Sequence, residues 1–203
     1  MSDTERWETR YRTGDIPWET GHASTELQRV IAEGGIAPCP ALELGCGTGV
    51  NAVWLAQHGF DVTALDLSPL AVERARERAA TAGARVRFLQ ADILAGPDVG
   101  GPFGFFFDRG CYHIVREVDL SGYLRLLERA LRPGATGLVL TGNARLPRTG
   151  PPVVREEEIR RELGQLFEVV RLREFQFDPA PGDGGPHLGW SCLLRKRAAP
   201  LAA

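Results

Sequence analysis

Short apolar runs alternate along the chain with stretches whose apolar residues recur at helical spacing. The runs that predict buried strands are residues 41–44, 62–67, 86–89, 103–107 and 138–141. The helical spacing and its flanking residues predict helices over residues 51–58, 69–82, 123–131 and 156–163. Strands that alternate with helices are typical of βαβ units, so the pattern predicts an α/β fold with a doubly wound, mostly parallel, Rossmann-like sheet.

The last part of the chain departs from this alternation. Residues 167–177 and 191–195 are predicted to form a closing pair of strands, which adds an antiparallel C-terminal strand to the sheet. Segment 178–189 between them is rich in Gly, Pro and Asp and is predicted to be a loop. Ligands bind at the carboxyl ends of the strands in such sheets. We therefore expect the loops that follow residues 44, 67, 91, 107 and 141 to surround one site.

The first of these loops reads Glu43-Leu44-Gly45-Cys46-Gly47-Thr48-Gly49, with glycine at every second position. Glycines let the backbone come close to a ligand, and the helix that follows directs its first N–H groups at that ligand. A dinucleotide fingerprint G-x-G-x-x-G would need a third glycine at position 50, where the chain has Val50. An ordinary strand-to-helix turn is the alternative interpretation.

Acidic residues follow the next two predicted strands. Asp66 ends the second strand, where a carboxylate can accept hydrogen bonds from both hydroxyls of a ribose, and Asp92 follows the third. The same ribose geometry serves a nicotinamide dinucleotide, so Asp66 alone does not discriminate between cofactors. The alternatives are that Asp66 caps the helix entered through Ser68 and Pro69, and that Asp92 is a turn residue.

The composition disfavours several other classes of protein. The 24 basic and 26 acidic residues give a net charge of −2, which argues against a general nucleic-acid binder. The start of the chain lacks a secretory signal, and no apolar run reaches the roughly 20 residues that span a bilayer, so we expect no membrane partner and a cytoplasmic location. The four cysteines form no C-x-x-C pair, which predicts free thiols and no metal site. We expect residues 1–203 to form a single domain, as a monomer or a weak homodimer.

The spacing E-x-G-x-G-x-G resembles that of class I S-adenosylmethionine-dependent methyltransferases. Segments before and after this loop make the resemblance more specific. Trp7 to Trp18 reads W-E-x-x-Y-x-x-G-x-x-P-W, and Phe107 opens the sequence F-D-R-G. A G-P-P element at 150–152 and a later G-W pair follow. The order of these motifs resembles that of the thiopurine methyltransferase family and its halide and thiol methyltransferase relatives. The resemblance covers nearly the whole chain. The resemblance implies the class I methyltransferase fold, with S-adenosyl-L-methionine as methyl donor and S-adenosyl-L-homocysteine as product.

The resemblance also implies which residues bind the donor. Trp7 and Tyr11 would lie on a short N-terminal helix over the cofactor, with residues 1–25 as an arm or lid. Asp92 would meet the adenine amino group, with Ile93 against the ring. The residues implied for the donor are Trp7, Tyr11, Glu43, Gly45, Gly47, Gly49, Asp66, Leu67, Asp92, Ile93 and Asp108.

At the reacting end, the resemblance implies Trp18, His22, Asp108 and Arg109. Trp18 would form an aromatic wall beside the transferred methyl, near His22, and Arg109 matches an active-site arginine of the family. The family's second substrate-side arginine is replaced by Pro186, next to His187, and this departure weighs against thiopurine-like anionic substrates.

Together these residues predict methyl transfer to a small-molecule acceptor, above all a thiol or a similar soft nucleophile. A thiol titrates near pH 8.5, and a cation such as Arg109 lowers that value, so little proton chemistry is needed. The first alternative is an O- or N-methyltransferase for a phenol, quinone or heterocycle, with His22 or His113 as base. The others are a cofactor-binding protein without catalysis and a nicotinamide oxidoreductase, which Val50 disfavours.

Overall fold

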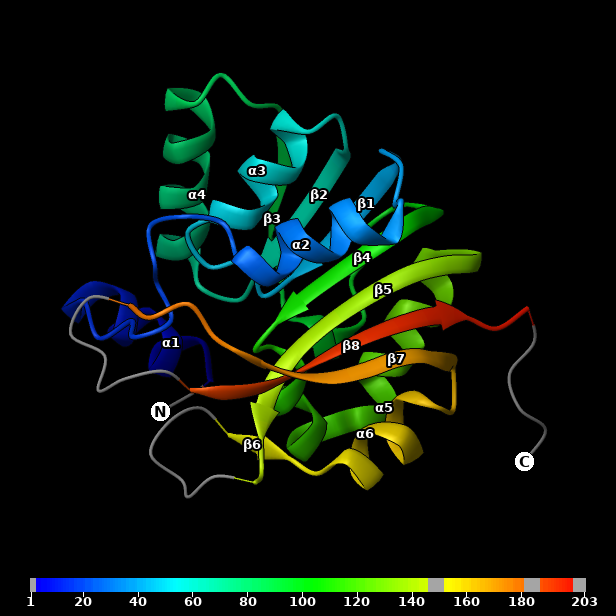
Figure 1. The fold of residues 1–203 in the computed structure, drawn as a ribbon. Helices are drawn as coiled ribbons and strands as arrows, with labels where there is room; N and C mark the ends of the chain where they lie inside the picture. The colour runs from blue at the N-terminus through cyan, green and yellow to red at the C-terminus, as the bar shows by residue number, and fades with distance from the viewer. Residues whose placement is uncertain (1–2, 146–151, 181–186, 199–203) are drawn as a thin grey trace.

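The apolar runs form a central eight-stranded sheet in the computed structural model (Figure 1), which describes residues 3–145, 152–180 and 187–198. The strands are β1 (Pro40–Leu44), β2 (Asp61–Asp66), β3 (Val86–Gln90), β4 (Phe103–Arg109), β5 (Leu131–Asn143), β6 (Val153–Val154), β7 (Phe167–Gln176) and β8 (Leu188–Lys196). Their order is β3-β2-β1-β4-β5-β8-β7, with β6 paired to β5. The first five strands are parallel, and β8 runs antiparallel to both β5 and β7. The predicted doubly wound sheet with an antiparallel C-terminal strand is confirmed.

Helices cover both faces of this sheet (Figure 1). The helices are α1 (Asp3–Thr13), α2 (Thr25–Gly34), α3 (Val50–Gln57), α4 (Pro69–Thr81), the short 3-10 helix η1 (Ile93–Ala95), α5 (Tyr112–Ala130) and α6 (Glu156–Leu163). One apolar core lies between the sheet and α2, α3 and α4, and a second lies between the sheet and α5 and α6. No helix in the described ranges is long and apolar enough to cross a membrane.

Strand β4 separates the two cores and shows why the sheet is buried on both sides. Phe103 and Phe106 pack in the core under α5, whereas Phe105 and Phe107 pack in the core under α3 and α4. Successive side chains of a strand point to opposite faces, so an apolar residue at nearly every position is what a doubly covered strand requires. A register shift between Phe103 and Phe105 interrupts the alternation, so Phe103 shares a core with Phe106, and from Phe105 onward the alternation fixes the face of each residue.

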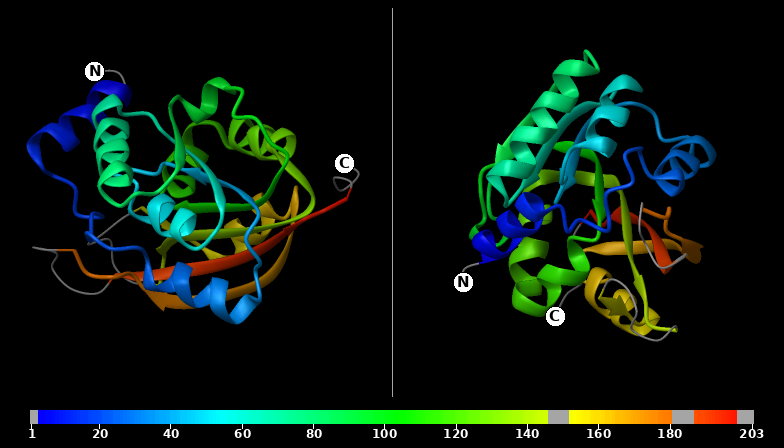
Figure 2. Two further views of the ribbon diagram at one scale, coloured as in Figure 1. Left: turned by 90° about the horizontal axis from the view of Figure 1, so that it is seen from above. Right: turned by 90° about the vertical axis from the view of Figure 1, so that its left-hand side faces the viewer.

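Helix α1 lies beside α4 in both views of Figure 2. The Glu8 carboxylate of α1 accepts hydrogen bonds from the Ser68 hydroxyl (2.6 Å) and the Leu70 backbone N–H (3.2 Å). The first N–H groups of a helix lack partners within the helix and attract a negative charge. The N-terminal arm is therefore attached to the start of α4, at the edge of the sheet where β2 ends.

The structure differs from the predicted helices in two places. Helix α5 is kinked at Asp119, which has a non-helical φ of −152° and ψ of 85°. The segment after the kink corresponds to the helix predicted over 123–131, whereas the segment before it, whose first backbone N–H groups Asp108 accepts, was not predicted. Helix α2 was not predicted, although the Ser24 side chain accepts the Leu27 N–H in the manner of an N-cap.

Candidate functional site

A cavity of about 560 Å³ opens where β1, β2 and β4 end. Most of the predicted site residues line the wall of this cavity. They come from α1, the segment after α1, the glycine loop, the ends of β2 and β4, and the start of η1. These are Trp7, Tyr11, Trp18, Gly45, Asp66, Leu67, Asp92, Ile93 and Arg109. The predicted residues that do not line the cavity are His22, Glu43, Gly47, Gly49 and Asp108.

Asp66 connects the glycine loop to the start of α4. One carboxylate oxygen accepts the Gly47 backbone N–H at 2.8 Å, and the other accepts the Ser68 N–H at 2.9 Å. Burial raises the pKa of Asp66, while these backbone hydrogen bonds lower it. A carboxylate oxygen can accept more than one hydrogen bond, so Asp66 can bind the glycine loop and a ribose at the same time. The capping interpretation and the ribose interpretation are compatible in this geometry.

Gly45 lies at the closest approach of the glycine loop to α5. Its φ of +63° is in the left-handed region, and a Cβ built there would lie 2.9 Å from the Cβ of Cys111. Both Gly45 and Cys111 line the cavity. A side chain at position 45 would therefore be strained by the backbone and would push the loop away from α5.

We expect Gly45→Ala to lower the free energy of unfolding by about 3 kcal/mol, from left-handed strain plus overpacking. Gly83→Ala is the matched control, because Gly83 has a φ of +62° with nothing within 4 Å of a built Cβ. The control should lose only the strain, about 1–2 kcal/mol. Urea unfolding of both variants measures the difference, and equal losses would mean that contact with Cys111 contributes nothing.

Glu43 and Asp108 lie beneath the cavity instead of in its wall. Asn51 donates to one Glu43 oxygen at 3.4 Å, and the other oxygen has no partner among the described residues. Burial raises the pKa of Glu43 to about 8. Glu43 therefore connects β1 to α3 through Asn51, and its second oxygen is available for a further hydrogen bond.

Asp108 caps α5. Its carboxylate accepts the backbone N–H groups of Cys111 (2.9 Å) and Tyr112 (3.0 Å) and the Tyr123 hydroxyl (2.9 Å). Burial raises the pKa of Asp108 to about 7, against these hydrogen bonds. Asp108 thus positions the start of α5, and its expected contact with the donor stays a prediction.

The arm from Trp7 to Trp18 forms the outer wall. Trp18 packs edge-on against Trp7 and Tyr11, with ring centroids 5.5 and 6.0 Å away, and the Arg10 guanidinium lies 4.4 Å from the Trp18 ring centroid. Glu19, next along the chain, bonds the Thr48 hydroxyl of the glycine loop. Trp7, Tyr11 and Trp18 thus line the cavity together, and the expectation that this segment acts as a lid stays a prediction.

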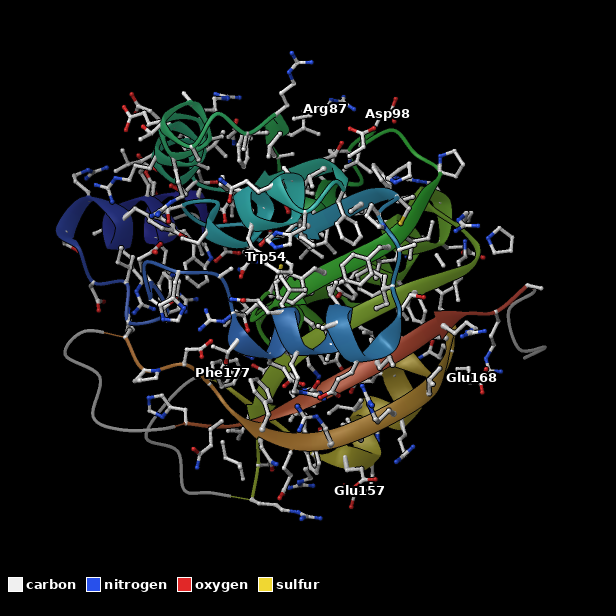
Figure 3. The ribbon with its side chains drawn as sticks, turned by 45° about the horizontal axis from the view of Figure 1, so that its top comes forward. Trp54, Arg87, Asp98, Glu157, Glu168 and Phe177 are labelled. Atoms are coloured by element: carbon white, nitrogen blue, oxygen red, sulfur yellow. The ribbon has the colours of Figure 1, made fainter. Side chains whose placement is uncertain are left out.

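Arg109 lines the cavity where β4 ends and lies against the arm. Its Nη1 donates to the Trp18 carbonyl at 2.9 Å, and its guanidinium lies 5.4 Å from the ring centroid of Phe177. Burial lowers the pKa of Arg109, but an arginine stays protonated throughout the range in which proteins work. Phe177 follows the end of β7 (Figure 3), and its neighbour Asp178 also lines the cavity.

The histidines considered as bases occupy different positions. His22 is exposed, its Nδ1 lies 3.1 Å from the Ala23 carbonyl, and it does not line the cavity. His113 is buried and does line the cavity. Burial, together with Arg109 and Arg116, lowers the pKa of His113 to about 3. His113 is therefore neutral near pH 7, and a base that weak takes little part in proton removal.

Several wall residues were not among the predicted ones. They are Arg10, Pro17, Cys111, Ile114, Val115, Phe177 and Asp178. The position of Cys111 to Val115 just after β4 was a usable signal, because the helix that follows a parallel strand begins at the ligand-binding edge. Of the predicted G-P-P element, Gly150 and Pro151 lie outside the described residues, as does Pro186, whereas Pro152 and His187 line the cavity.

These residues fit a nucleoside-containing methyl donor. Asp66 and Gly45 line the cavity from the end of β2 and from the glycine loop, and Leu67 and Ile93 provide apolar surface. Within the described ranges, no cluster of His, Cys, Asp and Glu is arranged to hold a metal ion.

Comparisons with known proteins agree on one family. A methyltransferase domain model matches residues 41–134. The chain is 32% identical over 172 residues to the 2-heptyl-1-hydroxyquinolin-4(1H)-one methyltransferase of Mycobacteroides abscessus, covering 83% of this chain and 75% of the relative. It is 26% identical over 189 residues to a probable thiol methyltransferase 2 of Arabidopsis thaliana, covering 90% and 82%. A solved structure from work on the conversion of a disulfide bond into a thioacetal group during echinomycin biosynthesis matches with a TM-score of 0.84 at 25% identity, covering 98% of this chain and 94% of that one.

Proposed function

We propose, since the chain belongs to the class I S-adenosylmethionine-dependent methyltransferases, that it methylates the sulfur of a small thiol. The enzyme class and the methyl donor follow from the family. The observation that supports a thiol is the position of Arg109. Its guanidinium lines the same cavity as Asp66, among aromatic and aliphatic side chains.

The residues of the chain suit a soft anionic acceptor. S-adenosylmethionine, when bound, supplies a methyl group on a positively charged sulfur that becomes a neutral thioether after transfer. Arg109 would hold the acceptor as a thiolate, whose proton has passed to solvent, and its charge would lower the thiol pKa. Trp18 and Phe177 would exclude water from the reacting atoms, and alignment in such a site supplies roughly 7–11 kcal/mol of the barrier.

The relatives support sulfur as the attacked atom without fixing the acceptor. One relative has a name that refers to thiols, and one structural neighbour comes from work on a disulfide and a thioacetal. The experiment that tests the proposal is turnover of a panel of small thiols, phenols, N-heterocycles and iodide with S-adenosylmethionine. Efficient methylation of phenols with no activity on any thiol would overturn it.

A second candidate is an O-methyltransferase for an acidic hydroxyl, because another relative is a 2-heptyl-1-hydroxyquinolin-4(1H)-one methyltransferase. His113, held neutral with a pKa of about 3, is a poor base for an ordinary phenol. This candidate therefore requires an acceptor that is already ionised near pH 7, such as an N-hydroxy group held by Arg109.

We also propose that residues 1–25, described from Asp3, act as a lid of the one methyltransferase domain. Glu8→Ala removes the carboxylate that bonds Ser68 and Leu70, so the affinity for S-adenosylhomocysteine should fall about fivefold to tenfold. The melting temperature should hardly change, because Tyr11 is the only buried residue of α1. Asp3→Ala, an exposed acidic residue of the same helix, is the control. Calorimetric titration decides between them, and equal affinities for the two variants would contradict the lid.

A further inference from the structure

The Nδ1 atom of His113 has hydrogen-bond partners, whereas its Nε2 atom has none within residues 3–145, 152–180 and 187–198. Its Nδ1 accepts the Gly142 backbone N–H at 3.3 Å and lies 3.2 Å from the Thr141 hydroxyl, both on β5. A ring nitrogen that accepts a backbone N–H bears no proton, so in the neutral imidazole the proton is on Nε2. Nε2 is thus assigned as a hydrogen-bond donor.

That donor has no partner among the described residues, and it lies beside open space. A Cβ built on Gly110 would lie 3.5 Å from both Cε1 and Nε2, so the glycine leaves this edge of the ring uncovered. Gly110 and His113 both line the cavity, together with Arg109. The two arginines that act on the imidazole, Arg109 on β4 and Arg116 on α5, both disfavour its protonated form. The ring therefore remains a neutral donor.

We propose that His113 is a specificity-determining residue, whose Nε2–H donates a hydrogen bond to an acceptor atom of the substrate adjacent to the atom that is methylated. This rests on the proposed function, in that Arg109 marks the acceptor end of the cavity. Arg109 would hold the anionic atom, and His113 would bind a neighbouring oxygen or nitrogen. A substrate without that second atom would leave a buried N–H unpaired, which is how such sites reject analogues.

The test uses two isomeric thiols that differ only in the position of an ester group, whose carbonyl oxygen is the hydrogen-bond acceptor. Methyl 2-mercaptobenzoate places its ester carbonyl next to the sulfur, and methyl 4-mercaptobenzoate places it across the ring. At a pH at which both are ionised, we expect the wild-type protein to favour the 2-isomer in kcat/KM by about tenfold. A wild-type ratio near one overturns the proposal without any variant.

Substitutions at His113 test whether this residue causes the preference for the 2-isomer. His113→Phe keeps a planar ring without a donor, and the ratio should fall to about one. His113→Gln can place an N–H near the position of Nε2 and should keep part of the preference. His58→Phe is the matched control, since His58 is an exposed histidine that caps the end of α3 outside the cavity wall. If His113→Phe does not fold, His113→Leu takes its place.

Further measurements distinguish a hydrogen-bonding role of His113 from a structural role and from a role as a base. A His113→Phe protein that folds and keeps the wild-type ratio overturns the proposal. So does a rise of kcat/KM with pH near 6.5 that vanishes in His113→Phe, because the imidazole would then be a base. If neither thiol reacts while phenols do, the thiol function fails, and methyl salicylate compared with methyl 4-hydroxybenzoate tests His113 in the same way.

Discussion

Replacing Arg109 with alanine is expected to lower kcat/KM for small thiols about 100-fold, while the affinity for S-adenosylhomocysteine changes less than about twofold. The guanidinium lies at the end of β4, two strands away from Asp66 at the end of β2, and both line the cavity, so we expect Arg109 to contact the acceptor and Asp66 the donor. Its loss removes a charge-assisted contact to the thiolate. Steady-state kinetics and calorimetric titration of the same preparation measure the two effects.

The pH dependence provides a second measure of the same substitution. A positive charge beside a thiol favours the thiolate and lowers the thiol pKa, so its removal should move the rise of kcat to higher pH by about one unit. Arg109→Lys keeps the charge but loses the planar fork, and it should retain part of the activity and the wild-type pH profile. If donor affinity falls as much as kcat/KM, Arg109 belongs to the donor site instead.

Replacing Asp66 with alanine is expected to weaken S-adenosylhomocysteine binding at least 100-fold, from the loss of two charge-assisted hydrogen bonds to a ribose. The free energy of unfolding should fall by only about 2 kcal/mol, because the lost backbone partners are the N–H groups of Gly47 and Ser68. Ser68 still caps α4 through its own hydroxyl, which accepts the Ala71 N–H at 3.1 Å. Urea unfolding without ligand and titration with S-adenosylhomocysteine test both numbers.

Asp66→Asn is the matched variant, because it keeps the shape and one acceptor oxygen. It should lose about 1–3 kcal/mol of the free energy of unfolding, because its NH2 group replaces an oxygen that accepts the Gly47 or the Ser68 N–H. It should also lose most of the donor affinity, since an amide accepts fewer hydrogen bonds and has no charge. If both variants lose stability and affinity in equal proportion, Asp66 acts only as a structural tie between the glycine loop and α4.

The parts of the fold and site that could be predicted from sequence depend on local chemistry. Ser68 and Pro69 start α4 as expected, and the helix predicted over 156–163 matches α6. Gly45 and Asp66 were placed correctly in the cavity wall because their positions follow from one strand-to-helix turn and one strand end. Such features need no information about distant parts of the chain.

The role of Asp108 could have been predicted from the period of two along β4. Asp108 shares a face with Phe106, which packs under α5, whereas Arg109 shares a face with Phe105 and Phe107. The side chain of Asp108 therefore points to the start of α5, where unpaired N–H groups of the helix receive it.

Other wall residues depend on contacts between distant segments. Phe177 reaches the cavity because β7 pairs with β8 over nine residue pairs and β8 pairs with β5, so its position depends on the register of two strand pairs. Thr25 and Asp178 are joined by hydrogen bonds across 153 positions of sequence. No short pattern in the chain encodes such a pairing, because tertiary packing determines it.

The packing of β4 also bears on how the acceptor range of such a protein can change during evolution. The four phenylalanines of the strand are 4% exposed or less, and they fix its place in the sheet through burial alone. Position 109 comes after them, so its location does not depend on the residue that occupies it. A different side chain there would inherit the same place beside the donor pocket at a small cost in stability. The proposed role of Arg109 therefore predicts that single substitutions at this one position would give a lineage access to acceptors of different charge on an unchanged scaffold.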